Sequence, residues 1–300
     1  MKLRKIFAAT DLSEPASEAL RQADELSRAT GAELVVCHVM PNPLRSNMLF
    51  PQLNEQIALD RPAERDRVVD ELTSYVAELT GRAPEDFAIL VDDGTPHRVL
   101  VEKAEHYGAD LVVVGSHGHG GLGHIVLGGV AEQVVRWAHC PVLIARPAEK
   151  SGVVLAATDF SAPAQTALAA AAEEARRRGA RLTLMHVMDL GVTSIMQAGM
   201  AFGAVVYSIP PEVKHALRDS IKAKLGEALA VTGVAGDTLI TEGTAAASIV
   251  QAAEELQAEL VVVGTAGVTG LKRLTLGSVA EAVARHAACS VLVVRQAPAA

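Results

Sequence analysis

The chain contains the same pattern twice, and this internal repeat limits its possible folds more than any other feature. The segment AATDLSEPA, which begins at Ala8, returns as AATDFSAPA in the second half, and CPVLIAR returns as CSVLVVR. Asp159 follows Asp11 by 148 residues, and Gly277 follows Gly128 by 149. One copy has the length of an ordinary domain, so the repeat predicts two tandem domains, at residues 1–147 and 152–296.

Each copy alternates short apolar runs with segments of helical character. Runs that are apolar throughout, rather than alternating, indicate parallel strands covered on both faces. Five such runs joined by right-handed helical crossovers predict an α/β fold of two tandem Rossmann-like domains, each a five-stranded parallel doubly wound sheet with helices on both faces. The predicted strands are 5–10, 33–39, 87–91, 111–114 and 142–146 in the first copy, and 153–158, 181–187, 238–241, 260–263 and 291–295 in the second.

Residues suited to ligand binding gather at the ends of the predicted strands. Asp11 and Asp159 follow the first strand of each copy, and a glycine-rich stretch follows the fourth. In a doubly wound sheet, ligands bind beyond the carboxyl ends of the strands. Glycine lets backbone N–H groups approach a phosphate, and the helix that starts near Gly277 directs its positive end there. Ser278 adds a hydroxyl donor, so the pattern predicts an anion site.

Other nucleotide and catalytic motifs do not fit. The sequence has no GxxxxGK[ST] and no GxSxG, which excludes a P-loop and a nucleophile elbow. A GxGxxG at Gly118, Gly120 and Gly123 follows the fourth strand and has no counterpart in the second copy, so we interpret it as chance.

At these residues the chain resembles the universal stress protein family in its tandem form, whose fold is the adenine nucleotide alpha hydrolase-like type. The family pattern G-2x-G-9x-G-[S/T] is met in full by Gly264, Gly267, Gly277 and Ser278. The resemblance implies an ATP site, with ADP and AMP as alternative ligands and Mg²⁺ as an accompanying ion. In that site Asp159 contacts the ribose and the backbone of Val187 reads the adenine edge. The resemblance further implies that ribose and phosphates are held by Gly264, Gly267, Gly277, Ser278 and Val279, and it adds Ala157 to the nucleotide site.

The first copy departs from the family pattern at its last position, where Gly129 replaces the hydroxyl residue. Its backbone donors remain, so we expect a weaker site there rather than none. By the same resemblance its candidate residues are Asp11, Val39, Gly115, Gly118, Gly128, Gly129 and Val130.

Several candidates also have simpler structural interpretations. Asp11 and Asp159 can brace the following turn, and the repeated His38 and His186 are interpreted as structural histidines. A loop with His117, His119 and His124 resembles a zinc ligand set, but we interpret it as a solvated glycine-rich loop.

Composition narrows the function further. The formal charge of −8 and the 3% aromatic content disfavour nucleic-acid binding. Cys37, Cys140 and Cys289 are odd in number with no CxxC pair, which predicts reduced thiols and a cytoplasmic location. The uncharged stretch Leu190–Pro211 is long enough to span a bilayer, but its glycines, prolines and polar residues argue against a membrane span. We expect a lid over the second site, or a surface for a partner or apolar ligand.

These observations predict a cytoplasmic tandem universal stress protein that binds ATP as a regulatory ligand in stress response. No catalytic residue is assigned. Two alternatives stay open: a slow ATP hydrolase or phosphotransferase, and a nucleotide-free interaction module. Because Val142–Arg146 and Val291–Arg295 are apolar and resemble sheet edges, we expect the two domains to form an intramolecular pseudo-dimer through them. A further homodimer is left open.

Overall fold

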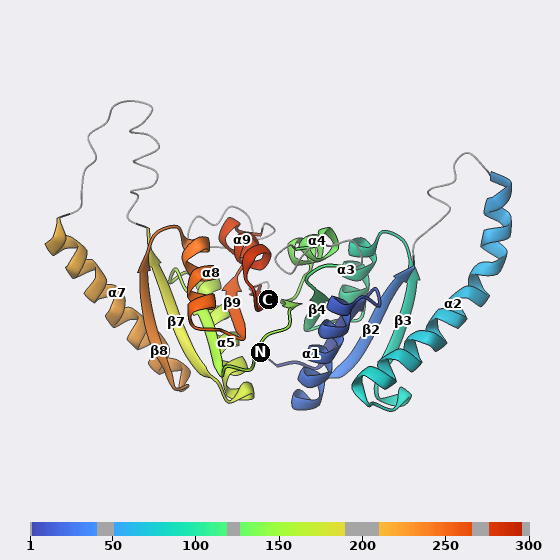
Figure 1. Cartoon of the computed structure of the whole chain (residues 1–300), viewed down its shortest axis with the longest axis horizontal. Coiled ribbons are helices and arrows are strands. Elements are labelled where there is room, and N and C mark those ends of the chain that lie inside the picture. Colours follow the sequence, from blue (N-terminus) through green and yellow to red (C-terminus); the bar gives the residue numbers. More distant parts are fainter. Residues whose placement is uncertain (1, 41–50, 119–126, 190–209, 266–275, 296–300) are drawn as a thin grey trace, which may run out of the picture. The chain divides into compact units, whose positions relative to one another are not determined.

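The computed structural model describes residues 2–40, 51–118, 127–189, 210–265 and 276–295, and of residues 51–60 the backbone only. The chain divides into two compact units, Lys2–Arg146 and Pro147–Ala300. Figure 1 colours the first unit from blue to green and the second from yellow-green to red.

The first unit is a five-stranded parallel sheet with the strand order β3-β2-β1-β4-β5. Its order reverses between β1 and β4, where a doubly wound sheet opens a cleft beyond the strand ends. The elements are β1 (Lys5–Thr10), α1 (Glu14–Thr30), β2 (Glu33–Met40), α2 (Pro51–Thr80), the 3₁₀ turn η2 (Pro84–Asp86), β3 (Ala88–Asp93), α3 (Pro96–His106), β4 (Leu111–Gly115), α4 (Gly129–Trp137) and β5 (Val142–Ala145).

The second unit repeats this topology, with the order β8-β7-β6-β9-β10 and the reversal between β6 and β9. The predicted α/β fold of two tandem doubly wound domains is therefore confirmed. The elements are β6 (Val153–Ala157), α5 (Ala162–Arg178), β7 (Arg181–Met188), α7 (Pro211–Thr232), β8 (Gly236–Glu242), α8 (Ala245–Glu255), β9 (Leu260–Gly264), α9 (Ser278–His286) and β10 (Ser290–Val294).

Both faces of each sheet are covered by helices. In β1 the consecutive residues Ile6, Phe7 and Ala8 are each 0% exposed, although neighbours along a strand point to opposite faces. Helices α1 and α2 pack together, as do α3 and α4, and these two pairs cover the two sides of the sheet (Figure 1). Because helices cover both faces, the strand sequences do not alternate between apolar and polar residues.

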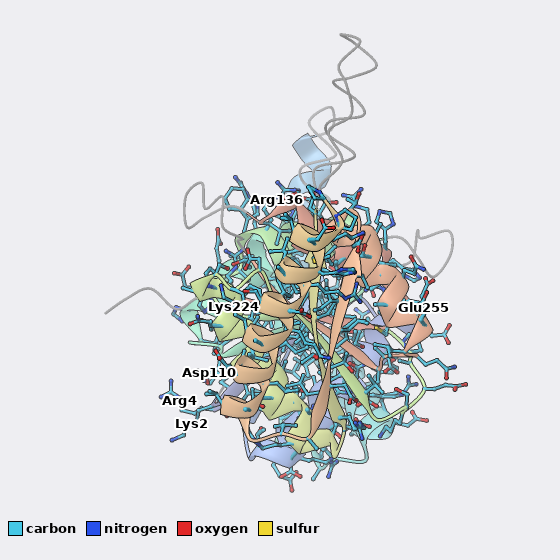
Figure 2. All side chains as sticks on the ribbon, turned by 90° about the vertical axis from the view of Figure 1, so that its left-hand side faces the viewer. Lys2, Arg4, Asp110, Arg136, Lys224 and Glu255 are labelled. Atoms are coloured by element: carbon cyan, nitrogen blue, oxygen red, sulfur yellow. The ribbon has the colours of Figure 1, made fainter. Side chains whose placement is uncertain are left out.

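A carboxylate at the start of the fourth strand fixes the start of the first. Asp110 accepts hydrogen bonds from the backbone N–H groups of Arg4 and Lys5 at 2.8 and 3.0 Å, and it pairs with the Arg4 guanidinium at 3.5 Å (Figure 2). Glu259 is the counterpart in the second unit, where it accepts from Gly152 N–H and pairs with Arg178. These contacts hold the central strands in register.

The first helix of each unit begins and ends at the residues that its sequence indicates. The Ser13 and Ser161 side chains accept hydrogen bonds from the backbone three residues later, which satisfies donors that the helix leaves unpaired. Gly31 and Gly179 end the helices with φ of 70° and 64°, in the left-handed region that favours glycine.

Helix α7 carries an apolar residue at every fourth position from Val213 to Leu229, but only part of this stripe is buried. Ile221 and Leu225 are buried, but Val213 and Leu217, earlier on the same stripe, are 55% and 42% exposed. The spacing therefore identifies the helix, while only its later turns pack on the sheet. Among the described residues, no helix is both long and apolar enough to span a bilayer.

All three cysteines are buried and none forms a disulfide. Burial raises the pKa of the Cys37 thiol to about 12, and the negative charge of Asp92 adds to this effect. At pH 8 about one Cys37 thiol in ten thousand is then ionised.

We expect folded protein at pH 8 to leave Cys37 unmodified by iodoacetamide, and urea-unfolded protein to be labelled at all three positions. Peptide mass spectrometry identifies the labelled sites; rapid native labelling of Cys37 would contradict this packing.

Candidate nucleotide site

The turn between β6 and α5 presents Asp159 at the end of the central strand. One carboxylate oxygen, Oδ1, accepts hydrogen bonds from the Ser161 N–H at 3.0 Å and the Ser161 hydroxyl at 2.5 Å. The hydroxyl of Thr158 accepts from the Phe160 N–H at 3.0 Å, and Phe160 has φ of 64°. A bulky residue in this region is strained, which is common where a turn positions a functional group.

The first unit builds the same turn around Asp11. Its Oδ1 accepts from the Ser13 N–H at 3.1 Å and the Ser13 hydroxyl at 2.5 Å, and Leu12 has φ of 65°. Both aspartates therefore brace their turns, as the simpler interpretation of the sequence holds. In each case the bracing also fixes where the carboxylate lies relative to the sheet.

A histidine from the neighbouring strand supports each turn. Nδ1 of His186 lies 2.8 Å from the carbonyl oxygen of Thr158, and Nδ1 of His38 lies 2.9 Å from that of Thr10. Because a carbonyl only accepts, Nδ1 carries the proton in both rings. This contact fits the structural role expected from the sequence.

The second unit adds an aromatic contact at this point. The Phe160 ring lies against the His186 ring, with centroids 4.9 Å apart, and the Lys224 ammonium lies 5.8 Å from the Phe160 centroid. Figure 2 labels Lys224 on α7. Helix α7 is thereby joined to the turn that carries Asp159.

A cavity of about 200 Å³ opens at the strand ends of the second unit. It brings together residues from both central strands, from β7 and from three helices, α5, α8 and α9. Every described residue that the resemblance assigned to this unit's nucleotide site lines it. The lining comprises Ala157, Thr158, Asp159, Ala164, Met185, His186, Val187, Ala245, Ile249, Val263, Gly264, Thr265, Gly277, Ser278, Val279 and Ala280.

One end of the cavity is formed by the first turn of α9. Ser278, Val279 and Ala280 are its first residues, and the N–H groups of a first turn have no acceptor within their own helix. The preceding residue is Gly277, which has no side chain to cap them, and its own N–H donates to the Thr265 carbonyl at 2.6 Å. The donors available to an anion are therefore those of the helix, reinforced by its dipole.

The glycines that begin the loops have a packing role that the sequence interpretation did not include. A Cβ on Gly115 would lie 2.7 Å from the carbonyl oxygen of Pro15 in the first turn of α1. On Gly264 the corresponding distance, to Pro163, is 3.1 Å. A Cβ on Gly118 would overlap the Asp11 Oδ2 atom, so the Asp11 carboxylate lies against the loop backbone. These glycines bring strand, turn and loop close together.

The end of the glycine loop is alike in the two units. The Gly128 N–H donates to the Ser116 carbonyl at 2.7 Å, and α4 starts at Gly129 and Val130 as α9 starts at Ser278 and Val279. Gly128 and Gly277 have nearly the same backbone angles, φ of −66° and −68°. The first unit thus keeps the backbone donors and lacks the hydroxyl.

Some predicted residues lie outside the described part of the chain. These are Gly267, the glycines Gly120 and Gly123, His119 and His124, and residues 190–209 of the expected lid. His117 is described, and its Nδ1 lies 3.0 Å from the Ser116 hydroxyl. Within the described ranges, no three His, Cys, Asp or Glu side chains group as metal ligands.

Sequence reasoning missed the apolar wall of the cavity. Met185, Ala245, Ile249 and Val263 line it, yet each stands in a strand or helix where an apolar residue reads as ordinary core. The available sequence signal is position: Ala245 and Ile249 stand in the first two turns of α8, and Val263 is next to last in β9.

The model of the universal stress protein family matches residues 2–146 and 151–295, one match in each unit. The chain belongs to the universal stress protein family. Its two family domains stand in tandem on one polypeptide.

Known members of the family support this assignment. A universal stress protein of Mycobacterium tuberculosis is 32% identical over 213 residues, which cover 67% of this chain and 66% of that relative. The match thus spans slightly less than two thirds of the relative's length. The crystal structure of a universal stress protein from Archaeoglobus fulgidus shares the fold, with a TM-score of 0.67 at 22% identity over 98% of this chain and 99% of that one.

The two strand-end glycines provide a matched test of packing. Gly115→Ala places a methyl group 2.7 Å from a backbone oxygen, whereas Gly264→Ala places it at 3.1 Å. We expect Gly115→Ala to lower the free energy of unfolding by about 1–3 kcal/mol and Gly264→Ala to lower it less. Urea unfolding followed by circular dichroism measures both, and the single tryptophan, Trp137, reports on the first unit. Equal losses would show that the closer approach is not limiting.

Proposed function

We propose that this universal stress protein binds an adenine nucleotide, with ATP as the preferred ligand, in the cavity of its second unit, and that the nucleotide regulates a role in stress response. The observation that carries the proposal is the composition of one cavity. An apolar wall, the Asp159 carboxylate and the first turn of α9 meet there. These three parts suit the base, the ribose and the phosphates.

The wall of the cavity favours a flat, uncharged base. Met185, Ile249 and Ala245 offer apolar side chains, and Val187, the next-to-last residue of β7, lines the same cavity. The base would stack on this wall while the Val187 backbone meets its polar edge. Asp159, held by Ser161, would accept a hydrogen bond from a ribose hydroxyl.

The phosphate end depends on neutral donors rather than on a fixed cation. The N–H groups of Ser278, Val279 and Ala280, with the Ser278 hydroxyl, would bind phosphate oxygens. Glu281, one residue further on, is paired with Arg285 at 3.5 Å, which reduces its repulsion of an anion. Mg²⁺ would be held by the phosphates and water, with no protein ligand assigned.

Binding without rapid hydrolysis fits the side chains that line the cavity. Among its described lining residues, the titratable ones are Asp159 and His186. Oδ1 of Asp159 and Nδ1 of His186 both bond to the turn. Both groups therefore stabilise the turn, which supports a role for the nucleotide as a regulatory ligand rather than as a substrate. Radiolabelled ATP turned over at a catalytic rate would favour the alternative of an ATP hydrolase or phosphotransferase.

The cellular setting is part of the proposal. A cytoplasmic location is in keeping with three buried cysteines that form no disulfide. Association of the two domains through Val142–Arg146 and Val291–Arg295 stays a prediction, as does a further homodimer. Sedimentation of the separately expressed halves tests the association, which stable, monomeric halves would contradict, and sedimentation of the full chain tests the homodimer.

Substitutions at the two glycine loops test the site. We expect Ser278→Ala to weaken ATP binding by about one to two decades, because a hydrogen bond to a charged phosphate contributes about 1.5–3 kcal/mol. Gly277→Val should weaken binding at least as much, because a side chain would enter the first turn of α9. Gly128→Val, at the equivalent position of the first unit, is the matched control and should leave the tight site intact. Isothermal titration calorimetry measures all three.

Equal losses from Gly128→Val and Gly277→Val would contradict the assignment to the second unit. Mass spectrometry of gently unfolded protein provides a separate measurement, since a nucleotide that co-purifies is released and identified directly. Protein that carries no nucleotide and shows no heat of ATP binding would refute the proposed function.

A further inference from the structure

An ion pair in the first unit lies beside the positions that correspond to the cavity lining of the second unit. Nζ of Lys103 lies 2.6 Å from Oδ2 of Asp92, and their side chains are 34% and 28% exposed. Lys103 is on α3 and Asp92 is near the end of β3. The described residues of the second unit have Ala252 and Thr241 at the equivalent positions, so the pair has no counterpart there.

The strand register places Asp92 on the cleft side of the sheet. Asp92 is paired with Val39 in the same way as Thr241 is paired with Val187, which lines the cavity of the second unit. Directly paired residues of neighbouring strands point to the same face. The carboxylate of Asp92 therefore stands on the face that in the second unit carries Met185 and Val187.

The helix that covers this face is also the equivalent one. Helix α8 lines the cavity with Ala245 and Ile249, and α3 begins at the matching residue, Pro96. Lys103 projects from α3 one turn after the counterpart of Ile249, where the second unit has Ala252, which is 3% exposed. A long cationic side chain thus replaces a methyl group beside the cleft.

A complementary exchange on the strand makes room for this lysine. The cavity wall residue Met185 corresponds to Cys37 in the first unit. The charges of both Asp92 and Lys103 act on the pKa of Cys37, so the ion pair lies close to that thiol. The first unit thus has the small Cys37 beside an ion pair, where the second unit has the larger Met185 and an alanine.

The ion pair is stable at neutral pH. Burial by itself raises the pKa of Asp92, but the hydrogen bond from Lys103, the Asp93 N–H and the charges of Lys103 and Arg65 outweigh it and hold that pKa below its ordinary value. The hydrogen bond to Asp92 is the main cause that raises the pKa of Lys103. Both groups therefore stay charged between the two titrations, across the whole physiological range.

We propose that the Asp92–Lys103 ion pair determines ligand choice between the two units by excluding the neutral adenine base from the cleft of the first unit. A base that stacks there would remove water from two partly exposed charges and return no hydrogen bond to them, which is unfavourable. In the second unit the same base releases water from Met185 and Ile249. The inference rests on the proposed function, since it assigns that function to one unit.

The test is a gain of binding in the full chain, measured by calorimetry as equivalents of ATP per chain. Wild type should bind one equivalent. Asp92→Thr with Lys103→Ala, which copies the second unit, should lower the Kd of the first unit by about tenfold or more and add a second equivalent. Asp92→Asn with Lys103→Met removes the charges while keeping the shape, and it should also add one.

Two further variants locate the new site. Adding Gly128→Val to either double variant should remove the second equivalent, because it disrupts the first unit's own loop. The neighbouring ion pair, Arg61 with Asp93 at 2.9 Å, is the matched control: Arg61→Met with Asp93→Thr should leave binding at one equivalent. Thermal unfolding shows that each variant is folded.

The outcomes separate the two proposals. If wild type and both folded double variants each bind one equivalent, the role of the ion pair is overturned and the proposed function stands. A second equivalent in the alanine–threonine variant alone would show that volume decides, which also overturns exclusion by charge. Wild type that binds no ATP would refute the proposed function, and this inference with it.

Discussion

The candidate site depends on the turn that follows the first strand of each unit. In the second unit Ser161 caps helix α5 and at the same time donates to the Asp159 carboxylate at 2.5 Å, so one residue starts the helix and orients the acid. The His186 ring holds the carbonyl of Thr158, and Phe160 accepts a strained φ of 64° between them. Strand, helix and carboxylate are thus fixed together, and the reversal of strand order beside this turn leaves room for a ligand.

The glycines contribute to this arrangement in two physical ways. At Gly115 and Gly264 the absence of a Cβ lets the end of the fourth strand approach the first turn of the opposing helix. At Gly277 the absence of a side chain leaves the first-turn donors of α9 facing the cavity. The glycine pattern typical of a phosphate site is therefore also required for close packing of backbone against backbone. Phosphate access and backbone packing both constrain the same loop, which explains why the two units share its glycine spacing.

Duplication gave the chain two scaffolds, and a few side chains distinguish them. The braced aspartate, the supporting histidine and the helix that follows the loop are common to both units. The differences lie at the cleft, with Ser278 against Gly129 and Met185 against Cys37, and beside it, with Thr241 and Ala252 against the Asp92–Lys103 pair. None of these exchanges alters a strand or a helix boundary. Ligand choice can therefore diverge while the fold stays the same.

The repeat, the apolar strands and the spaced glycines were sufficient to predict the fold and the family, because each is a pattern visible in the sequence. They also indicated Asp159, Gly264, Gly277 and Ser278, which stand at strand and helix ends. The apolar wall of Met185 and Ile249, and the half-buried stripe of α7, were decided only by tertiary structure, since an apolar residue looks alike in a core and in a cleft. The same holds for Asp92 and Lys103: their meeting beside Val39 depends on strand register and helix packing, which bring together residues that no sequence spacing connects.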